Sequence, residues 1–138
     1  MRYLFTLILV SFVITETAFA DRPYSESGKK HPDLAGIYIF DHPDEGELTY
    51  TFKTDGTGDY VSEKHGTIYE FAWRVSMYQG IIHEHTYKEI EHPCANVVMD
   101  LINGYKLPFG VKDDVIKICW KDDLAFNNNV YKKKEDIE

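Results

Sequence analysis

Hydrophobic and polar side chains alternate along most of this chain, most clearly over residues 67–77. In that run one face carries only apolar or aromatic side chains, namely Tyr69, Phe71, Trp73, Val75 and Met77. Glu70 and Arg74 fall on the opposite, polar face. Alternation with a period of two is typical of a strand with one buried face. The pattern therefore predicts a long strand with Trp73 inside and Arg74 outside.

A second alternating run, residues 47–53, places Leu48, Tyr50 and Phe52 on one face and leads into the stretch KTDGTGDY, residues 53–60. A phosphate-binding loop leads into a helix whose first amides meet the anion, whereas this stretch continues as strand. A calcium loop needs more oxygen ligands than Asp55, Thr57 and Asp59 supply. We therefore interpret the stretch as a hairpin turn centred on Asp55-Gly56.

Further turn signals, Gln79-Gly80 and Asn103-Gly104, separate other apolar segments. Strands are expected at 97–102, 105–109, 115–120 and 124–131, among others. Residues 95–102 would also suit a short helix, but two valines and the Asn-Gly turn favour a strand. Many short strands joined by tight turns predict an all-β fold. We expect a single antiparallel up-and-down barrel or closed sandwich of eight to nine strands between residues 35 and 132.

The N-terminal segment has the features of a cleavable signal peptide. Arg2 precedes an apolar run over residues 4–14, which is too short to span a membrane comfortably. Ala18-Phe19-Ala20 has small residues at the positions that a signal peptidase reads, so cleavage is expected after Ala20. An uncleaved anchor is the alternative. Residues 21–33 then form a flexible polar leader and residues 34–138 a single barrel domain, exported to the periplasm or secreted.

Charge and cysteine content narrow the function classes. The chain has a net charge of −8, which disfavours nucleic acid and anionic membranes as partners and is compatible with a cationic protein partner. Its two cysteines, Cys94 and Cys119, read as one structural disulfide in an exported protein. Two buried free thiols are the alternative. The spacing fits neither a zinc ribbon nor a CxxC redox centre.

Three segments carry a family resemblance: Gly36-Ile37-Tyr38, TYTFKTDGTGDY (residues 49–60) and YEFAWRV (residues 69–75). They resemble the small lipocalin-like proteins of bacteria, which are calycin-type barrels with a Gly-x-Trp first strand, a Phe-x-x-Asp-Gly-Thr-Gly hairpin and a later Phe-x-Trp strand. Phe52 and residues 55–58 match the hairpin, and Phe71 and Trp73 match the later strand. Tyr38 stands where the family has tryptophan. The resemblance covers about residues 35–77 and implies a fold more than an activity.

The most suggestive polar cluster is His83-Glu84-His85. In a strand, His83, His85, Tyr87 and Glu89 share one face, and two imidazoles with a carboxylate can ligate a metal. The spacing also resembles the first cupin motif, although the cupin glycines are missing and no histidine follows Pro108-Phe109-Gly110. A polar strand face, or two histidines at a cavity mouth, is the plainer interpretation. No catalytic constellation is recognised, and no cofactor is expected.

The leading hypothesis is an exported, non-enzymatic binding protein that takes a small, partly apolar ligand in the barrel. An eight-stranded barrel has room for packed side chains or for one small ligand. The expected ligand-binding residues are Tyr50, Phe52, Tyr69, Phe71, Trp73, His83 and His85, with Phe71 at the cavity floor and Tyr69 at its mouth. The alternatives are an acidic inhibitor or interaction module for a cationic protein, and a cupin-like metal enzyme using His83, His85 and Glu89.

Overall fold

The structure is a computed structural model that describes residues 22–104, 113–120 and 122–134. The expected signal peptide, the expected strand over residues 105–109 and the end of the charged tail lie outside the described residues. The described residues form strands and two short 3₁₀ turns, η1 (Gly28–Lys30) and η2 (Pro32–Leu34). The strands are β1 (Pro23–Ser27), β2 (Gly36–His42), β3 (Gly46–Phe52), β4 (Thr57–Ser62), β5 (Gly66–Tyr78), β6 (Ile81–Ile82), β7 (Glu84–Thr86), β8 (Pro93–Gly104), β9 (Asp113–Cys119), β10 (Asp123–Phe126) and β11 (Asn129–Lys133).

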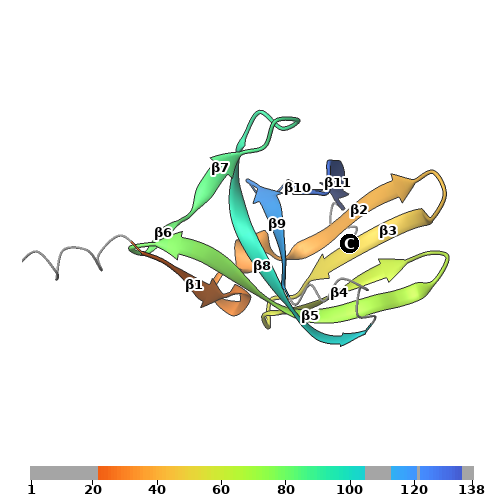
Figure 1. The fold of residues 1–138 in the computed structure, drawn as a ribbon, viewed down its shortest axis with the longest axis horizontal. Coiled ribbons are helices and arrows are strands. Elements are labelled where there is room, and N and C mark those ends of the chain that lie inside the picture. The colour runs from red at the N-terminus through yellow and green to blue at the C-terminus, as the bar shows by residue number, and fades with distance from the viewer. Residues whose placement is uncertain (1–21, 105–112, 121, 135–138) are drawn as a thin grey trace, which may run out of the picture.

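Eight of these strands form a closed antiparallel barrel (Figure 1). The order round the barrel is β2, β3, β4, β5, β8, β9, β10 and β11; β5 pairs with β8, and β11 pairs with β2 to close the ring. Strands that follow one another along the chain are neighbours, which is the order of an up-and-down barrel. The prediction of an all-β antiparallel barrel is confirmed, and β1, β6 and β7 are additional strands outside the ring.

The alternation along β5 is confirmed side chain by side chain. Tyr69, Phe71, Trp73, Val75 and Met77 are all buried. Arg74 lies on the outer face, where its guanidinium forms a two-point contact with the Asp100 carboxylate at 2.7 and 3.1 Å. The segment that was ambiguous between strand and helix is part of β8, because its residues pair with both β5 and β9.

KTDGTGDY contains the β3–β4 hairpin turn, as predicted. The Lys53 N–H donates to the Thr57 carbonyl at 2.8 Å, and Gly56 has a φ of 86°, which a residue with a side chain rarely adopts. The Asp55 carboxylate accepts hydrogen bonds from the Thr57 amide and hydroxyl at 2.9 and 2.6 Å. Asp55 therefore stabilises the turn. Gln79 and Gly80 also have positive φ and form the predicted β5–β6 turn.

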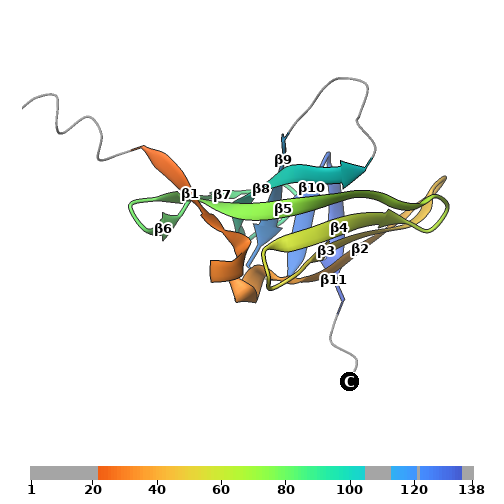
Figure 2. The same cartoon turned by 90° about the horizontal axis from the view of Figure 1, so that it is seen from below.

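The segment expected to be a flexible leader is instead paired with the barrel. β1 forms an antiparallel ladder with residues 74–78 of β5, beyond the part of β5 that β4 covers. The turns η1 and η2 follow β1 on this side of the barrel (Figure 2). The side chains of β1 are mostly exposed, so the strand docks through backbone hydrogen bonds. The leader was expected because residues 21–33 are polar, with two prolines and a Lys-Lys pair. A strand that is held through its backbone shows no hydrophobic alternation.

Gly28 in η1 packs directly against the indole of Trp73. A Cβ added at Gly28 would lie 2.2 Å from ring carbons, so only glycine fits without a shift. The Trp73 Nε1–H donates to the Lys53 carbonyl at 3.0 Å. Tyr38 is fully buried and donates its hydroxyl to the Leu34 carbonyl at 2.9 Å. Trp73, Tyr38 and the 3₁₀ turns therefore fill one end of the barrel.

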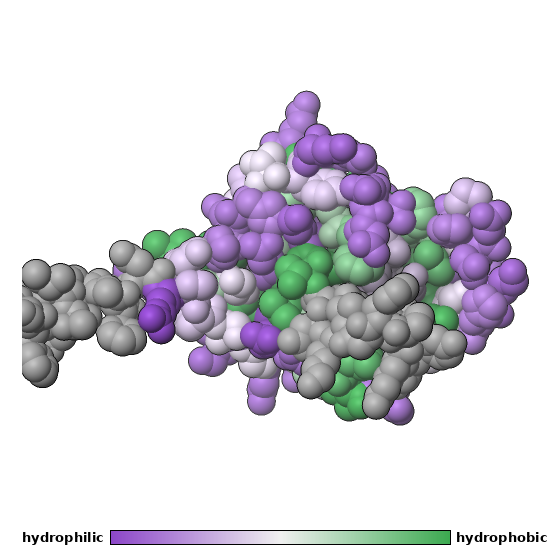
Figure 3. Space-filling model, in the orientation of Figure 1, coloured by the Kyte–Doolittle hydropathy of each residue, from purple (hydrophilic) through white to green (hydrophobic). Residues whose placement is uncertain are grey.

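Cys94 and Cys119 form the predicted disulfide between the neighbouring strands β8 and β9. Both cysteines are fully buried beside Ile90 and Ala125, in a small apolar cluster next to the main core. The outer surface seen in Figure 3 is mainly hydrophilic, with apolar surface over β8 and β9. Ile102 of β8 and Val115 of β9 are the large exposed apolar side chains on these two strands. No helix of the described residues is long and apolar enough to cross a membrane.

Candidate functional site

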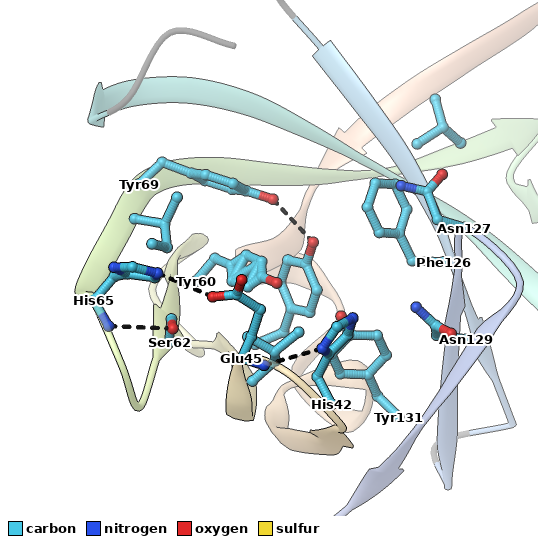
Figure 4. A pocket seen from close by; sticks show the side chains of 14 residues that line it. His42, Glu45, Tyr60, Ser62, His65, Tyr69, Phe126, Asn127, Asn129 and Tyr131 are labelled. Atoms are coloured by element: carbon cyan, nitrogen blue, oxygen red, sulfur yellow. Dashed lines mark hydrogen bonds and ion pairs between the residues drawn. The ribbon is translucent and has the colours of Figure 1, made fainter.

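A pocket of about 700 Å³ opens at one end of the barrel. Successive connections of an up-and-down barrel lie at alternate ends, so the β2–β3, β4–β5 and β10–β11 turns meet at this end. The β3–β4 turn and Trp73 lie at the other. Residues from these three turns, from the strands that they join and from β9 line the pocket (Figure 4): His42, Glu45, Leu48, Tyr50, Tyr60, Ser62, His65, Ile68, Tyr69, Val115, Phe126, Asn127, Asn129 and Tyr131.

Four tyrosines form the centre of the pocket wall. Tyr50 is fully buried, and its hydroxyl is 2.9 Å from the Tyr69 hydroxyl. The Tyr50 ring centroid is 4.3 Å from that of Tyr60 and 5.1 Å from that of Tyr131. Phenols supply both a large apolar ring and a hydroxyl that can donate or accept. This cluster therefore presents apolar surface and hydrogen-bonding groups in the same small space.

Strand register explains how the tyrosines meet. Tyr50 of β3 is the cross-strand partner of Tyr60 of β4, and Tyr60 is the partner of Tyr69 of β5. Cross-strand partners project from the same face of a sheet, so the three rings lie side by side inside the barrel. Tyr131 reaches them from β11, which becomes a neighbour of β2 only when the barrel closes. Its ring also packs on Phe40 of β2, with centroids 5.4 Å apart.

Burial raises the pKa of Tyr50, Tyr60 and Tyr131. Burial raises the pKa of Tyr50 well above the usual value, and Tyr69 raises it further through its charge and its hydrogen bond. Burial likewise raises the pKa of Tyr131 far above its usual range, and the Tyr60 phenol adds to the shift. A phenol ordinarily ionises near pH 10. The pocket therefore offers neutral hydroxyls at physiological pH, each able to act as donor or acceptor.

Polar groups from the turns form the rim of the pocket. The His65 Nε2 is 3.0 Å from the Glu45 carboxylate, a contact that joins the β4–β5 turn to the β2–β3 turn. The His42 Nδ1 accepts hydrogen bonds from the backbone N–H groups of Asp44 and Glu45 at 3.0 and 3.1 Å. Ser62, although polar, is buried and accepts from the His65 amide. Figure 4 shows His42, Glu45, Ser62 and His65 among the residues that line the pocket.

The sequence-predicted residues divide between the pocket and the core. Tyr50 and Tyr69 line the pocket. Phe52, Phe71 and Trp73 are buried deeper in the barrel, in contact with one another and away from the pocket lining. Phe71, expected at the cavity floor, lies behind the lining residues, with its ring centroid 6.0 Å from that of Tyr69. Tertiary packing thus fills the barrel around Phe71 and Trp73, whereas the pocket opens near its other end.

His83 and His85 do not belong to this pocket. They lie in the excursion that leaves β5 at the end of the barrel opposite to the pocket, beside β6 and in β7. The His83 ring packs on Tyr78 with centroids 4.3 Å apart, and its Nδ1 is 3.4 Å from the Ser76 hydroxyl. Burial lowers the pKa of His85, and the charges of Lys117 and His83 lower it further. The expected face shared with Glu89 is not formed, because β7 ends at Thr86.

The cupin-like alternative is not supported. No group of three or more His, Cys, Asp or Glu side chains that could hold a metal ion is present among the described residues. A catalytic metal site needs three protein ligands held in a fixed geometry.

Sequence reasoning missed Tyr60, Phe126, Tyr131 and the rim residues. Tyr60 had a usable signal: a hairpin with its turn at Asp55-Gly56 places Tyr60 opposite Tyr50. The sequence has no such signal for Tyr131 and Phe126, because these side chains meet the other tyrosines only when the barrel closes.

No family model, curated protein or solved structure matches this chain. The architecture agrees with the calycin-type barrel that the short motifs implied.

Proposed function

We propose that this chain is a binding protein that takes a small, partly apolar ligand in the tyrosine-lined pocket. The observation that carries the proposal is the pocket itself, whose volume of about 700 Å³ falls within the usual range for small-molecule sites. Such sites are mostly apolar with a few polar groups that orient the ligand. Leu48, Ile68 and Phe126 supply the apolar part here, and the tyrosine hydroxyls supply the polar part.

The pocket supports moderate affinity. Burying about 200 Å² of apolar ligand surface is worth up to about 5 kcal/mol at 25 cal/mol per Å². The loss of translational and rotational freedom offsets part of any such gain, so micromolar or weaker binding is expected for a simple apolar probe. A natural ligand that also hydrogen-bonds the tyrosine hydroxyls would bind more tightly.

Export and family are part of the same proposal. The Cys94–Cys119 disulfide fits an oxidising compartment, and the N-terminal sequence has the features of a signal peptide with cleavage after Ala20. The motifs around Phe52 and Trp73 resemble those of calycin-type barrels, and the up-and-down barrel agrees with that resemblance. We infer a periplasmic or secreted lipocalin-like binding protein.

A neutral fluorescent dye, Nile red, tests the proposal. We expect saturable binding to the mature protein with a dissociation constant in the micromolar range. Ile68→Trp should abolish it, because Ile68 lines the pocket and the larger indole would occupy the space. Ile37→Trp is the matched control: Ile37 is 39% exposed and does not line the pocket, so the same substitution should leave binding unchanged.

Circular dichroism should show that both variants retain the β-sheet spectrum. Absence of saturable dye binding to the wild-type protein would refute the ligand-binding proposal. That result would favour the alternative of an inhibitor or interaction module, in which the acidic outer surface contacts a cationic protein. Equal loss of binding in the two variants would show that the dye binds elsewhere on the barrel.

A further inference from the structure

The pocket has a one-sided charge. Among its described lining residues, Glu45 is the one carboxylate, and neither lysine nor arginine is present. The remaining ionisable groups are tyrosines, His42 and His65. A carboxylate ligand placed here would meet Glu45 without a fixed cation to balance either charge. The pocket therefore disfavours a bound anionic group and favours a bound cationic group.

The two histidines do not reverse this balance. The His42 Nδ1 accepts two backbone N–H bonds, so it is the unprotonated nitrogen, and in the neutral ring the proton is on Nε2. The His65 Nε2 contacts the Glu45 carboxylate, where a neutral imidazole donates one hydrogen bond and leaves the negative charge in place. The Glu45 side chain remains 40% exposed at the pocket mouth.

The field of Glu45 reaches into the pocket. Burial raises the pKa of Tyr60, a hydrogen bond from Tyr131 opposes the shift, and the negative charge of Glu45 raises the pKa further. The charge of Glu45 therefore resists a further negative charge beside Tyr60. It would stabilise a positive charge at the same place.

The aromatic rings add a second attraction for a cation. The face of a tyrosine ring carries partial negative charge and attracts an ammonium group within about 6 Å of its centroid. Tyr50, Tyr60, Tyr69 and Tyr131 all line the pocket, together with Phe126. Leu48 and Ile68 provide uncharged surface for the remainder of a ligand. The lining thus combines one carboxylate, several electron-rich rings and an apolar wall.

We propose that the natural ligand is a cationic amine with an apolar body, with its ammonium group between Glu45 and the tyrosine rings. This inference rests on the proposed binding function and specifies the chemical class of the ligand. The ammonium would donate to the Glu45 carboxylate and to phenol oxygens, and the apolar body would contact Leu48 and Ile68.

Three probes with one carbon skeleton and different end groups test the charge: 4-phenylbutylamine, 4-phenylbutan-1-ol and 4-phenylbutyrate. Each is titrated against the Nile red complex at low salt and pH 8, above the usual titration range of histidine. The amine should displace the dye at the lowest concentration, the alcohol at a higher one, and the carboxylate at the highest. Glu45→Gln should weaken the amine about fivefold, the size expected for a partly exposed ion pair, and leave the alcohol unchanged.

Glu70→Gln is the matched control, because Glu70 is exposed on β5 outside the pocket lining. It removes the same charge from the protein and should change none of the three affinities.

Equal displacement by the amine and the alcohol, or tightest binding of the carboxylate, would overturn the inference and leave the binding function intact. So would an equal loss of amine affinity in Glu45→Gln and Glu70→Gln, or a dye complex that none of the three probes displaces. Failure of Nile red itself to bind would instead refute the proposed function, so the two failures are distinguishable.

Discussion

Trp73→Ala tests the register of β5, on which both the core and the pocket depend. The indole is 1% exposed and lies edge-on to Phe52, with ring centroids 5.5 Å apart. Its Nε1–H donates to the Lys53 carbonyl in the β3–β4 turn, and Gly28 packs against its ring face. The substitution therefore removes the contacts that β5 makes through this indole with the β3–β4 turn and with η1.

The expected cost follows from these contacts. Truncating a fully buried tryptophan to alanine costs about 3–5 kcal/mol, from lost transfer energy and the cavity left behind. The Lys53 carbonyl keeps its hydrogen bond from the Gly56 N–H at 3.1 Å, so loss of the bond from the indole adds little to that cost. For a domain of this size, about 3–5 kcal/mol corresponds to a fall in Tm of roughly 10–20 °C. That is a large share of the roughly 5–15 kcal/mol by which domains are stable.

Urea unfolding followed by far-ultraviolet circular dichroism measures the change without relying on the fluorescence of the deleted residue. Arg74→Ala is the control on the opposite face of the same strand. Arg74 contacts Asp100, but the two side chains are 37% and 40% exposed, so about 1 kcal/mol or less is expected. Equal destabilisation by the two substitutions, or a cost below about 1 kcal/mol for Trp73→Ala, would refute the assignment of Trp73 to the inner face.

Gly28→Ala should destabilise the protein by about 1–3 kcal/mol in the same urea assay, because the new methyl group cannot fit against Trp73 without a shift of the indole or of η1. Replacing Cys94 and Cys119 together by alanine should cost about 3–4 kcal/mol, and reductant should then have no further effect on the unfolding midpoint. Burial, together with Asp122 and Asp123, raises the pKa of Tyr38 above its ordinary value of 10.0. The unfolded chain therefore loses this proton first, so stability is present below about pH 10 and falls as pH rises above it. Tyr38→Phe should reduce the slope of unfolding free energy against pH between about pH 9.5 and 11.5, and an unchanged slope would contradict the burial of this phenol.

Local features of the sequence determined the two faces of β5 and the tight turns of this protein. The alternation in β5 depends only on the two-residue repeat of an extended chain, so it specifies which side chains share a face before any partner strand is known. Asp55-Gly56 and Gln79-Gly80 form tight turns because glycine adopts positive φ at little cost. The disulfide was likewise predictable, because Cys94 and Cys119 are the two cysteines of the chain.

The N-terminal strand was decided by tertiary structure alone. β1 has exposed side chains, and it pairs because β5 continues past the residues that β4 covers and leaves backbone groups without partners there. Unpaired backbone groups in a sheet are a strong driving force for strand addition, and the identity of the added side chains matters little. The sequence of such a strand therefore carries no periodic signal.

The pocket was also decided by closure of the barrel. The repeat places Tyr50, Phe52, Tyr69 and Phe71 inside, but it does not state which inward positions are filled by opposing side chains. That depends on which residues face them from strands distant in the sequence. Gly28 and η1 fill the end of the barrel at Trp73, whereas Tyr131 and Phe126 arrive at the other end with space left between them and Tyr69. Packing of this kind is a property of three-dimensional volumes, which a pattern of alternation along one chain does not encode.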